Sequence, residues 1–136
     1  MRIIGFNFDK ISVERLKDKV EGLKITTNID ISEIKEIKSE ILKTKEELLQ
    51  IKFVYTVNYE PEFAKVDLKG TVLLSMDEKQ VKEILKEWKK KKISEEFRMP
   101  LFNIILRKAA AKSLNLEDEM NLPLHIPLPS LRPKEK

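Results

Sequence analysis

The chain has 136 residues, of which 37% are charged, with 27 Lys and Arg against 23 Asp and Glu. This length fits one domain (1–136) with a modest core. The absence of cysteine excludes disulfides and cysteine-based metal sites and fits a reducing compartment, so we expect a cytoplasmic protein. No apolar run approaches the roughly 18 residues of a membrane span, and the N-terminus lacks the pattern of a signal peptide.

The first part of the chain alternates between strand-like and helix-like spacing. Ile4, Phe6 and Phe8 alternate and predict an opening strand, whereas Val13, Leu16 and Val20 follow a helix-like spacing before Gly22. A second strand is predicted by alternation at Leu23, Ile25, Thr27, Ile29 and Ile31. Between residues 32 and 45 a helix face and a continued or bulged strand fit the pattern equally well, and the sequence leaves both open.

The longest regular pattern consists of two alternating runs on either side of Glu60-Pro61-Glu62. Apolar side chains occupy the odd positions from Leu49 to Tyr59 and then the even positions from Ala64 to Met76, interrupted only by Gly70. A period of two with a turn between the runs predicts a long antiparallel hairpin with one apolar face.

Two helices are predicted after the hairpin. Asp77 suits an N-cap with Gln80 as the third helical residue, and the run Lys89-Lys90-Lys91-Lys92 suits the negative end of the helix dipole. The face of this first helix carries Val81, Ile84, Leu85 and Trp88. Pro100 is expected to open the second helix, which should run to about Leu114.

The C-terminal segment, residues 121–131, alternates leucine or isoleucine with residues that are mostly proline. Proline cannot donate to a sheet ladder, so this segment favours an extended or polyproline conformation over an interior strand. We call it the strap and expect it to lie across an apolar surface. A short basic tail, residues 132–136, follows it.

No arrangement of residues in the sequence predicts catalysis. The single histidine, His125, lies among prolines without an obvious oriented partner, so we interpret it as a bystander. Glu117-Asp118-Glu119 lacks the spacing of a calcium loop and is interpreted as a charged loop. Three scattered glycines make no phosphate-binding loop. We therefore expect a non-enzymatic protein without a cofactor or a bound metal.

The apolar material exceeds what four strands and two helices need, which predicts self-association or a binding groove. The order of the patterns resembles the bacterial secretion chaperone SecB and its relatives over nearly the whole chain. The matching pieces are Phe8-Asp9-Lys10-Ile11-Ser12, Tyr55-Thr56-Val57, Lys69-Gly70-Thr71-Val72, Met99-Pro100-Leu101-Phe102-Asn103 and Leu122-Pro123-Leu124-His125-Ile126-Pro127.

This resemblance implies an α+β fold with a four-stranded antiparallel sheet and two helices packed on one face. It also implies a homotetramer, built as a dimer of dimers, that acts as an ATP-independent holdase for unfolded or nascent polypeptides. The family's C-terminal tail is acidic or otherwise specialised, whereas the tail here is basic. Relatives that control toxin–antitoxin systems therefore fit as well as those that serve export. The candidate client-binding residues are Tyr59, Phe63, Trp88, Phe97, Met99, Leu122, Leu124, Ile126 and Leu128.

Two other functions stay open at this point. Trp88 beside Lys89–Lys92 fits a nucleic-acid- or ribosome-associated domain, in which the ring stacks on a base and the lysines contact phosphates, although Trp88 is also in register with the apolar helix face. The other open possibility is a purely structural subunit of an oligomer. Salt separates the first two, because binding driven by phosphates falls steeply with ionic strength and apolar capture does not.

Overall fold

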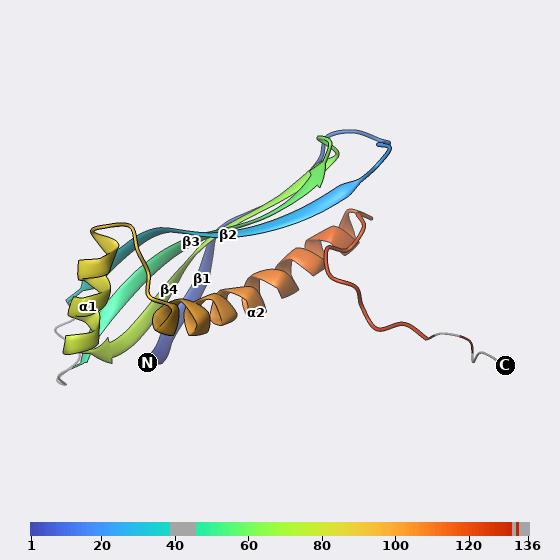
Figure 1. The fold of residues 1–136 in the computed structure, drawn as a ribbon. Helices are drawn as coiled ribbons and strands as arrows, with labels where there is room; N and C mark the ends of the chain where they lie inside the picture. Colours follow the sequence, from blue (N-terminus) through green and yellow to red (C-terminus); the bar gives the residue numbers. More distant parts are fainter. Residues whose placement is uncertain (39–45, 132, 134–136) are drawn as a thin grey trace.

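The computed structural model describes residues 1–38, 46–131 and 133, and within these it forms one sheet and two helices. The elements in chain order are β1 (Arg2–Arg15), β2 (Lys24–Ile37), β3 (Glu46–Glu60), β4 (Ala64–Asp77), α1 (Glu78–Trp88) and α2 (Glu95–Glu119). The strands form an antiparallel sheet in the order β1-β4-β3-β2, and α2 runs along one face of it (Figure 1). This arrangement confirms the α+β fold expected from the sequence.

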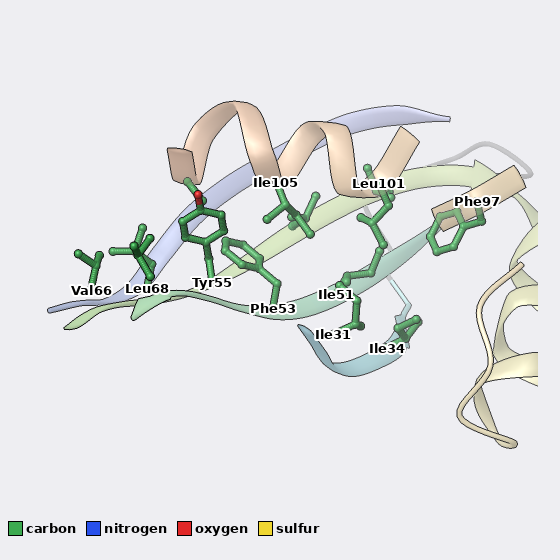
Figure 2. Packing of buried hydrophobic residues seen from close by; sticks show 14 of the residues in the cluster. Ile31, Ile34, Ile51, Phe53, Tyr55, Val66, Leu68, Phe97, Leu101 and Ile105 are labelled. Atoms are coloured by element: carbon green, nitrogen blue, oxygen red, sulfur yellow. The ribbon is translucent and has the colours of Figure 1, made fainter. Parts of the chain in front are cut away.

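The predicted hairpin is confirmed as β3 and β4, which form the centre of the sheet. Their register pairs Leu49 with Leu74 and Tyr59 with Ala64, so the odd positions of β3 and the even positions of β4 share one face. These β3 side chains are at most 1% exposed. In Figure 2 Phe53 and Tyr55 project from the sheet toward α2, whose Ile105 points back at them. The alternation in the sequence therefore marks the core.

The helix expected around Val13 and Leu16 is wrong, because β1 continues to Arg15. The pairing of β1 with β4 shifts between Phe8 and Lys10. A bulge of this kind reverses which side chains face the core, since it adds one residue to a period of two. Phe6 and Phe8 face the core before the shift, and Val13 does so after it. The predicted helix spacing joined Val13, inside β1, to Leu16 and Val20, which lie beyond the end of the strand.

A second register shift resolves part of the segment that the sequence left open. β2 runs to Ile37, and its pairing with β3 shifts between Ile31 and Glu33, so that Ile34 faces the core opposite Ile51. The bulged-strand alternative is thus confirmed for residues 32–37. Residues 39–45 lie outside the described residues.

The helices begin and end differently from the prediction. Asp77 is the N-cap of α1, but its side chain makes no capping hydrogen bond, so the predicted capping box is not formed. α2 begins at Glu95, after Ser94, rather than at Pro100, and it continues to Glu119 rather than to Leu114. The apolar stripe explains the extra length, because buried residues recur about every four positions at both ends. They are Phe97, Leu101, Ile105, Ala109, Ser113, Leu116 and Glu117.

Neither helix in the described ranges combines the length and the apolar composition that crossing a bilayer requires. After α2 the chain forms no helix or strand through residue 131. The strap turns back at the end of α2, and its last part extends away from the sheet and from α2 (Figure 1).

Candidate functional site

A groove of about 360 Å³ lies between the edge strand β2 and the helical layer. We call it the β2 groove. Its apolar lining comes from β2, from the end of α1, from the loop between the helices and from the first half of α2, at Ile29, Ile31, Trp88, Ile93 and Phe102. The strand order places β2 at the edge, with β3 as its partner in the sheet. Main-chain groups along the outer side of β2 thus lie next to apolar side chains, which is the combination that an extended peptide uses when it adds a strand.

Two cations stand over the aromatic rings of this groove. The Lys91 Nζ atom lies 4.5 Å from the centroid of the Trp88 ring, and the Arg98 Cζ atom lies 5.2 Å from the centroid of Phe102. Such cation–π contacts hold long side chains along a ring without removing their charge from water. Asp30 is the carboxylate in the groove lining, so the lining carries more positive than negative charge.

A smaller hollow of about 240 Å³ lies between α1 and the first turns of α2, beside the end of β4. Its apolar lining includes Met76, Ile84, Phe97 and Pro100, and its rim carries the carboxylates of Glu83, Glu87 and Glu96. Phe97 is only 6% exposed, so its ring forms the floor of the hollow and contributes chiefly to the core.

The strap is attached to the far end of the sheet by hydrogen bonds to its main chain. The Tyr59 hydroxyl donates to the Pro123 carbonyl oxygen at 2.5 Å, and the Arg15 guanidinium donates to the carbonyl oxygen of Asn121 at 3.3 Å and to that of Met120, the C-cap of α2, at 2.6 Å. Leu122 is 5% exposed and belongs to the core cluster. The strap thus lies on an apolar surface as predicted, anchored by one leucine.

A buried polar cluster of Glu117, His125 and Tyr55 holds the next part of the strap. The Nδ1 atom of His125 lies 2.9 Å and 2.7 Å from the two carboxylate oxygens of Glu117, and its Nε2 atom lies 2.7 Å from the Tyr55 hydroxyl. The main-chain N–H of His125 also donates to Glu117 at 2.7 Å, and the Ser113 hydroxyl donates to the same carboxylate. Every hydrogen-bonding atom of the buried carboxylate therefore has a partner, as burial requires.

Burial and the charge of Glu117 make the two tyrosines of this region weaker acids. Burial, with a smaller contribution from Glu117, raises the pKa of Tyr55 from 10.0 to about 12. The same causes raise the pKa of Tyr59 above its usual value. Both hydroxyls therefore stay protonated as hydrogen-bond donors, and neither suits the role of a nucleophile.

Two interpretations of single residues from the sequence are corrected by this cluster. His125 is not a bystander, because its side chain is only 1% exposed and contacts two elements. Glu117 does not lie in a charged loop, because it is fully buried in the last turns of α2. Neither correction creates a catalytic site, since the imidazole is enclosed and Tyr55 keeps its proton.

The predicted client-binding residues do not form a single groove. Tyr59, Phe63 and Leu122 meet at the strap, where the Tyr59 and Phe63 rings are 6.3 Å apart, and all three are buried. Trp88 lines the β2 groove and Phe97 the smaller hollow. Leu124 is half-buried on the strap. The exposed members are Met99 at 65%, Ile126 at 39% and Leu128 at 58%.

Sequence patterns missed several residues that shape these surfaces. Ile29 of the predicted second strand and Phe102 of the predicted second helix were not singled out as binding residues, yet both line the β2 groove. Arg15 gave no signal, because its partner Met120 lies about a hundred positions away in the sequence. For Glu117 the one local signal is its position four residues after Ser113 on the apolar stripe of α2, which indicates a buried side chain.

The fold is that of a SecB-like chaperone. The chain is similar to the solved structure of the Mycobacterium tuberculosis Rv1957 SecB-like chaperone, in complex with a ChAD peptide from the Rv1956 HigA1 antitoxin. The TM-score is 0.53 at 10% sequence identity, and the alignment covers 98% of this chain and 92% of the other. No family model and no curated protein matches the sequence. The fold is therefore shared across nearly the whole length at low sequence identity.

Proposed function

We propose that this protein is an ATP-independent chaperone, a holdase of the SecB-like kind, that captures unfolded or nascent polypeptides in the cytoplasm. The β2 groove carries this proposal, because it combines an edge strand with a lining of isoleucines and aromatic rings. Apolar client side chains would be buried at about 25 cal/mol per Å², and hydrogen bonds to the strand edge would tolerate many sequences. The mode of action needs no catalytic residue.

The similarity to Rv1957 supports a polypeptide as the ligand. That structure contains a peptide from an antitoxin, bound to a chaperone of the same fold. We infer that either a toxin–antitoxin pair or a set of exported proteins supplies the clients here. A neighbouring pair of genes for a toxin and its antitoxin would favour the first source.

The test is suppression of the aggregation of an unfolded, reduced client protein without ATP, followed by light scattering. Trp88→Ala and Phe102→Ala should weaken suppression, because each removes an aromatic ring from the β2 groove. Leu106→Ala is a matched control, since Leu106 is a 38% exposed apolar residue of α2 that does not line the groove. Unchanged client turbidity with the unsubstituted protein in excess would refute the holdase proposal.

We further propose a homo-oligomer, a tetramer built as a dimer of dimers. The edges of the long hairpin do not supply an interface, because β3 and β4 are both central strands of the sheet. Support comes instead from the edge strand β1, where Ile3, Ile4 and Ile11 are 51%, 44% and 47% exposed. A monomeric mass by light scattering at tens of micromolar would contradict an oligomer.

The runner-up is a nucleic-acid- or ribosome-associated domain that uses Lys89–Lys92. The hollow that Lys90 and Lys92 line also contains Glu83 and Glu87, so carboxylates lie among the lysines. Lys91 stands over the Trp88 ring on which a base would stack. Both observations favour the holdase, and steep loss of binding with salt would favour the runner-up.

A further inference from the structure

The smaller hollow carries negative charge around an apolar floor. Its volume is about 240 Å³, and its floor includes three buried side chains, those of Met76, Ile84 and Phe97. The carboxylates of Glu83, Glu87 and Glu96 lie on its rim, and no lysine or arginine of the described ranges lines it. Glu87 is held at the rim, because it accepts the main-chain N–H of Ser94 at 3.1 Å. The hollow therefore suits an apolar side chain that is accompanied by positive charge.

The outer strap, residues 126–131, has this complementary composition. Its leucines Leu128 and Leu131 are 58% and 102% exposed, and it extends away from the sheet and from α2 (Figure 1). Arg132 follows Leu131 directly, and the rest of the basic tail adds two lysines and one glutamate. Two prolines of the outer strap restrict its backbone, so it loses less conformational entropy on binding than a flexible segment would.

The outer strap is too short to fill the hollow of its own molecule. His125 is fixed to Glu117 in the last turns of α2, whereas the hollow lies at Phe97 in the first turns. At 1.5 Å per residue, roughly 30 Å of helix separate Glu117 from Phe97. Residues 126–131 span at most about 20 Å when fully extended. Leu131 therefore fits the hollow of a second molecule rather than its own.

We propose that the outer strap of one molecule docks in the smaller hollow of a second copy, with Leu131 on the apolar floor and Arg132 beside the carboxylates of the rim. The anchored part of the strap, from Leu122 to His125, keeps its contacts in this exchange. Two such contacts related by a two-fold axis form a closed pair, in which each molecule gives one arm and receives another. The exchange goes beyond the holdase proposal and does not use the β2 groove.

Site-specific cross-linking tests the exchange in the full chain, because the sequence contains no cysteine. Ser94→Cys places a thiol in the lining of the hollow, and Ser130→Cys places one in the outer strap. The reference is Asn28→Cys on β2, and all three positions are exposed. With a short thiol cross-linker, Ser130→Cys should form a covalent dimer with Ser94→Cys at least about fivefold faster than with Asn28→Cys. Equal rates would overturn the exchange.

The same thiols distinguish the other occupants of the hollow. In a chain that carries both Ser94→Cys and Ser130→Cys, a cross-link without an increase in mass would place the strap in its own hollow and overturn the contact between copies. Cross-linking of Ser94→Cys to an unfolded client with a single cysteine, in preference to Ser130→Cys, would assign the hollow to clients and also overturn it.

Charge reversal is a second test, read by sedimentation. Glu83→Lys with Glu96→Lys reverses the rim, and Arg132→Glu with Lys134→Glu reverses the tail. Each variant alone should self-associate at least about tenfold more weakly than the unsubstituted protein, because like charges then face each other. A mixture of the two should recover the association, since each reversed rim meets a reversed tail and each original rim an original tail. Unchanged association of both variants, or no recovery in the mixture, would overturn the contact.

A matched charge control and a client assay complete the design. Glu21→Lys, an exposed position in the loop between β1 and β2, should self-associate like the unsubstituted protein. Suppression of client aggregation is measured on the same variants and should be unaffected, because other residues line the β2 groove. Failure of the arm exchange and failure of the holdase proposal are therefore distinguishable.

Discussion

The hydroxyl of Tyr55 lies 2.7 Å from Nε2 of His125, although 70 positions separate the two residues. Nδ1 of the same ring faces the Glu117 carboxylate, an arrangement in which Nδ1–H donates to Glu117 and, in the neutral imidazole, Nε2 accepts from the tyrosine. One imidazole thereby connects the centre of the sheet, the end of α2 and the strap. The consequences of this network for stability can be measured separately from client binding.

Alkaline pH should destabilise the protein through Tyr55. Burial and Glu117 raise the pKa of this hydroxyl from 10.0 to about 12. Between pH 10 and about 12 the unfolded chain releases the proton while the folded chain keeps it, so the free energy of unfolding falls as pH rises through this window. Urea unfolding at a series of pH values, followed by circular dichroism, measures this slope.

Tyr55→Phe removes this titration, so its free energy of unfolding should fall less steeply above pH 10. At neutral pH the variant should be less stable by about 1 kcal/mol, because Nε2 of His125 loses its donor. Equal slopes for Tyr55→Phe and the unsubstituted protein would show that the Tyr55 hydroxyl is not held protonated by the fold.

Gly70→Ala should destabilise the sheet by about 1 to 3 kcal/mol, because the added methyl group overpacks the core. A Cβ atom at Gly70 would collide with the Phe53 ring and lie 2.7 Å from the carbonyl oxygen of Asn7. Gly5→Ala is the matched control in the same sheet, since its Cβ atom would lie 3.7 Å from Leu73, an ordinary contact. Thermal unfolding compares the two, and equal midpoints would contradict the close packing at Gly70.

Single replacements by serine along the strap should differ sharply in how much they lower the free energy of unfolding. Leu122→Ser should cost about 2 to 5 kcal/mol, because a buried side chain is lost and a hydroxyl takes its place. Ile126→Ser should cost less than about 1 kcal/mol, since Ile126 is 39% exposed. A triple replacement of Leu122, Leu124 and Ile126 would mix these effects. Similar unfolding free energies for the two single variants would place the boundary of the anchored strap elsewhere.

Client capture should persist or strengthen when the salt concentration is raised from about 50 to about 500 mM, because burial of apolar surface is not screened. The readout is the affinity for a labelled unfolded polypeptide at each concentration. Replacing Lys89, Lys90 and Lys92 together with glutamine should leave this affinity nearly unchanged. A loss of about a thousandfold over this range would instead indicate phosphate-type binding by the lysines.

The sequence alone determined the central hairpin and the inner face of α1, because those signals are local. From Leu49 to Tyr59 and again from Ala64 to Met76 the apolar positions follow a period of two, so alternation maps directly onto burial. The inner face of α1 is likewise marked by four apolar residues, Val81, Ile84, Leu85 and Trp88. The order of these elements was enough to recognise the SecB-like fold.

Only the tertiary structure decided the extents of β1, β2 and α2. The register shifts near Asp9 in β1 and Ser32 in β2 change whether even-numbered or odd-numbered side chains face the core. Without the partner strand, a shift of one residue looks the same in the sequence as a change to helical spacing. The first turn of α2 exists because Phe97 is buried against other elements, a contact that propensity at Pro100 does not reveal.

Tertiary structure also decided what the individual residues of the strap do. From the sequence, Leu122 and Leu128 are equivalent members of one apolar pattern, and His125 is a lone polar residue between them. Folding buries Leu122, exposes Leu128 and places a carboxylate and a phenol on either side of His125. A buried polar residue is fixed by partners that are distant along the chain, so its environment is set only when the sheet, the helix and the strap come together.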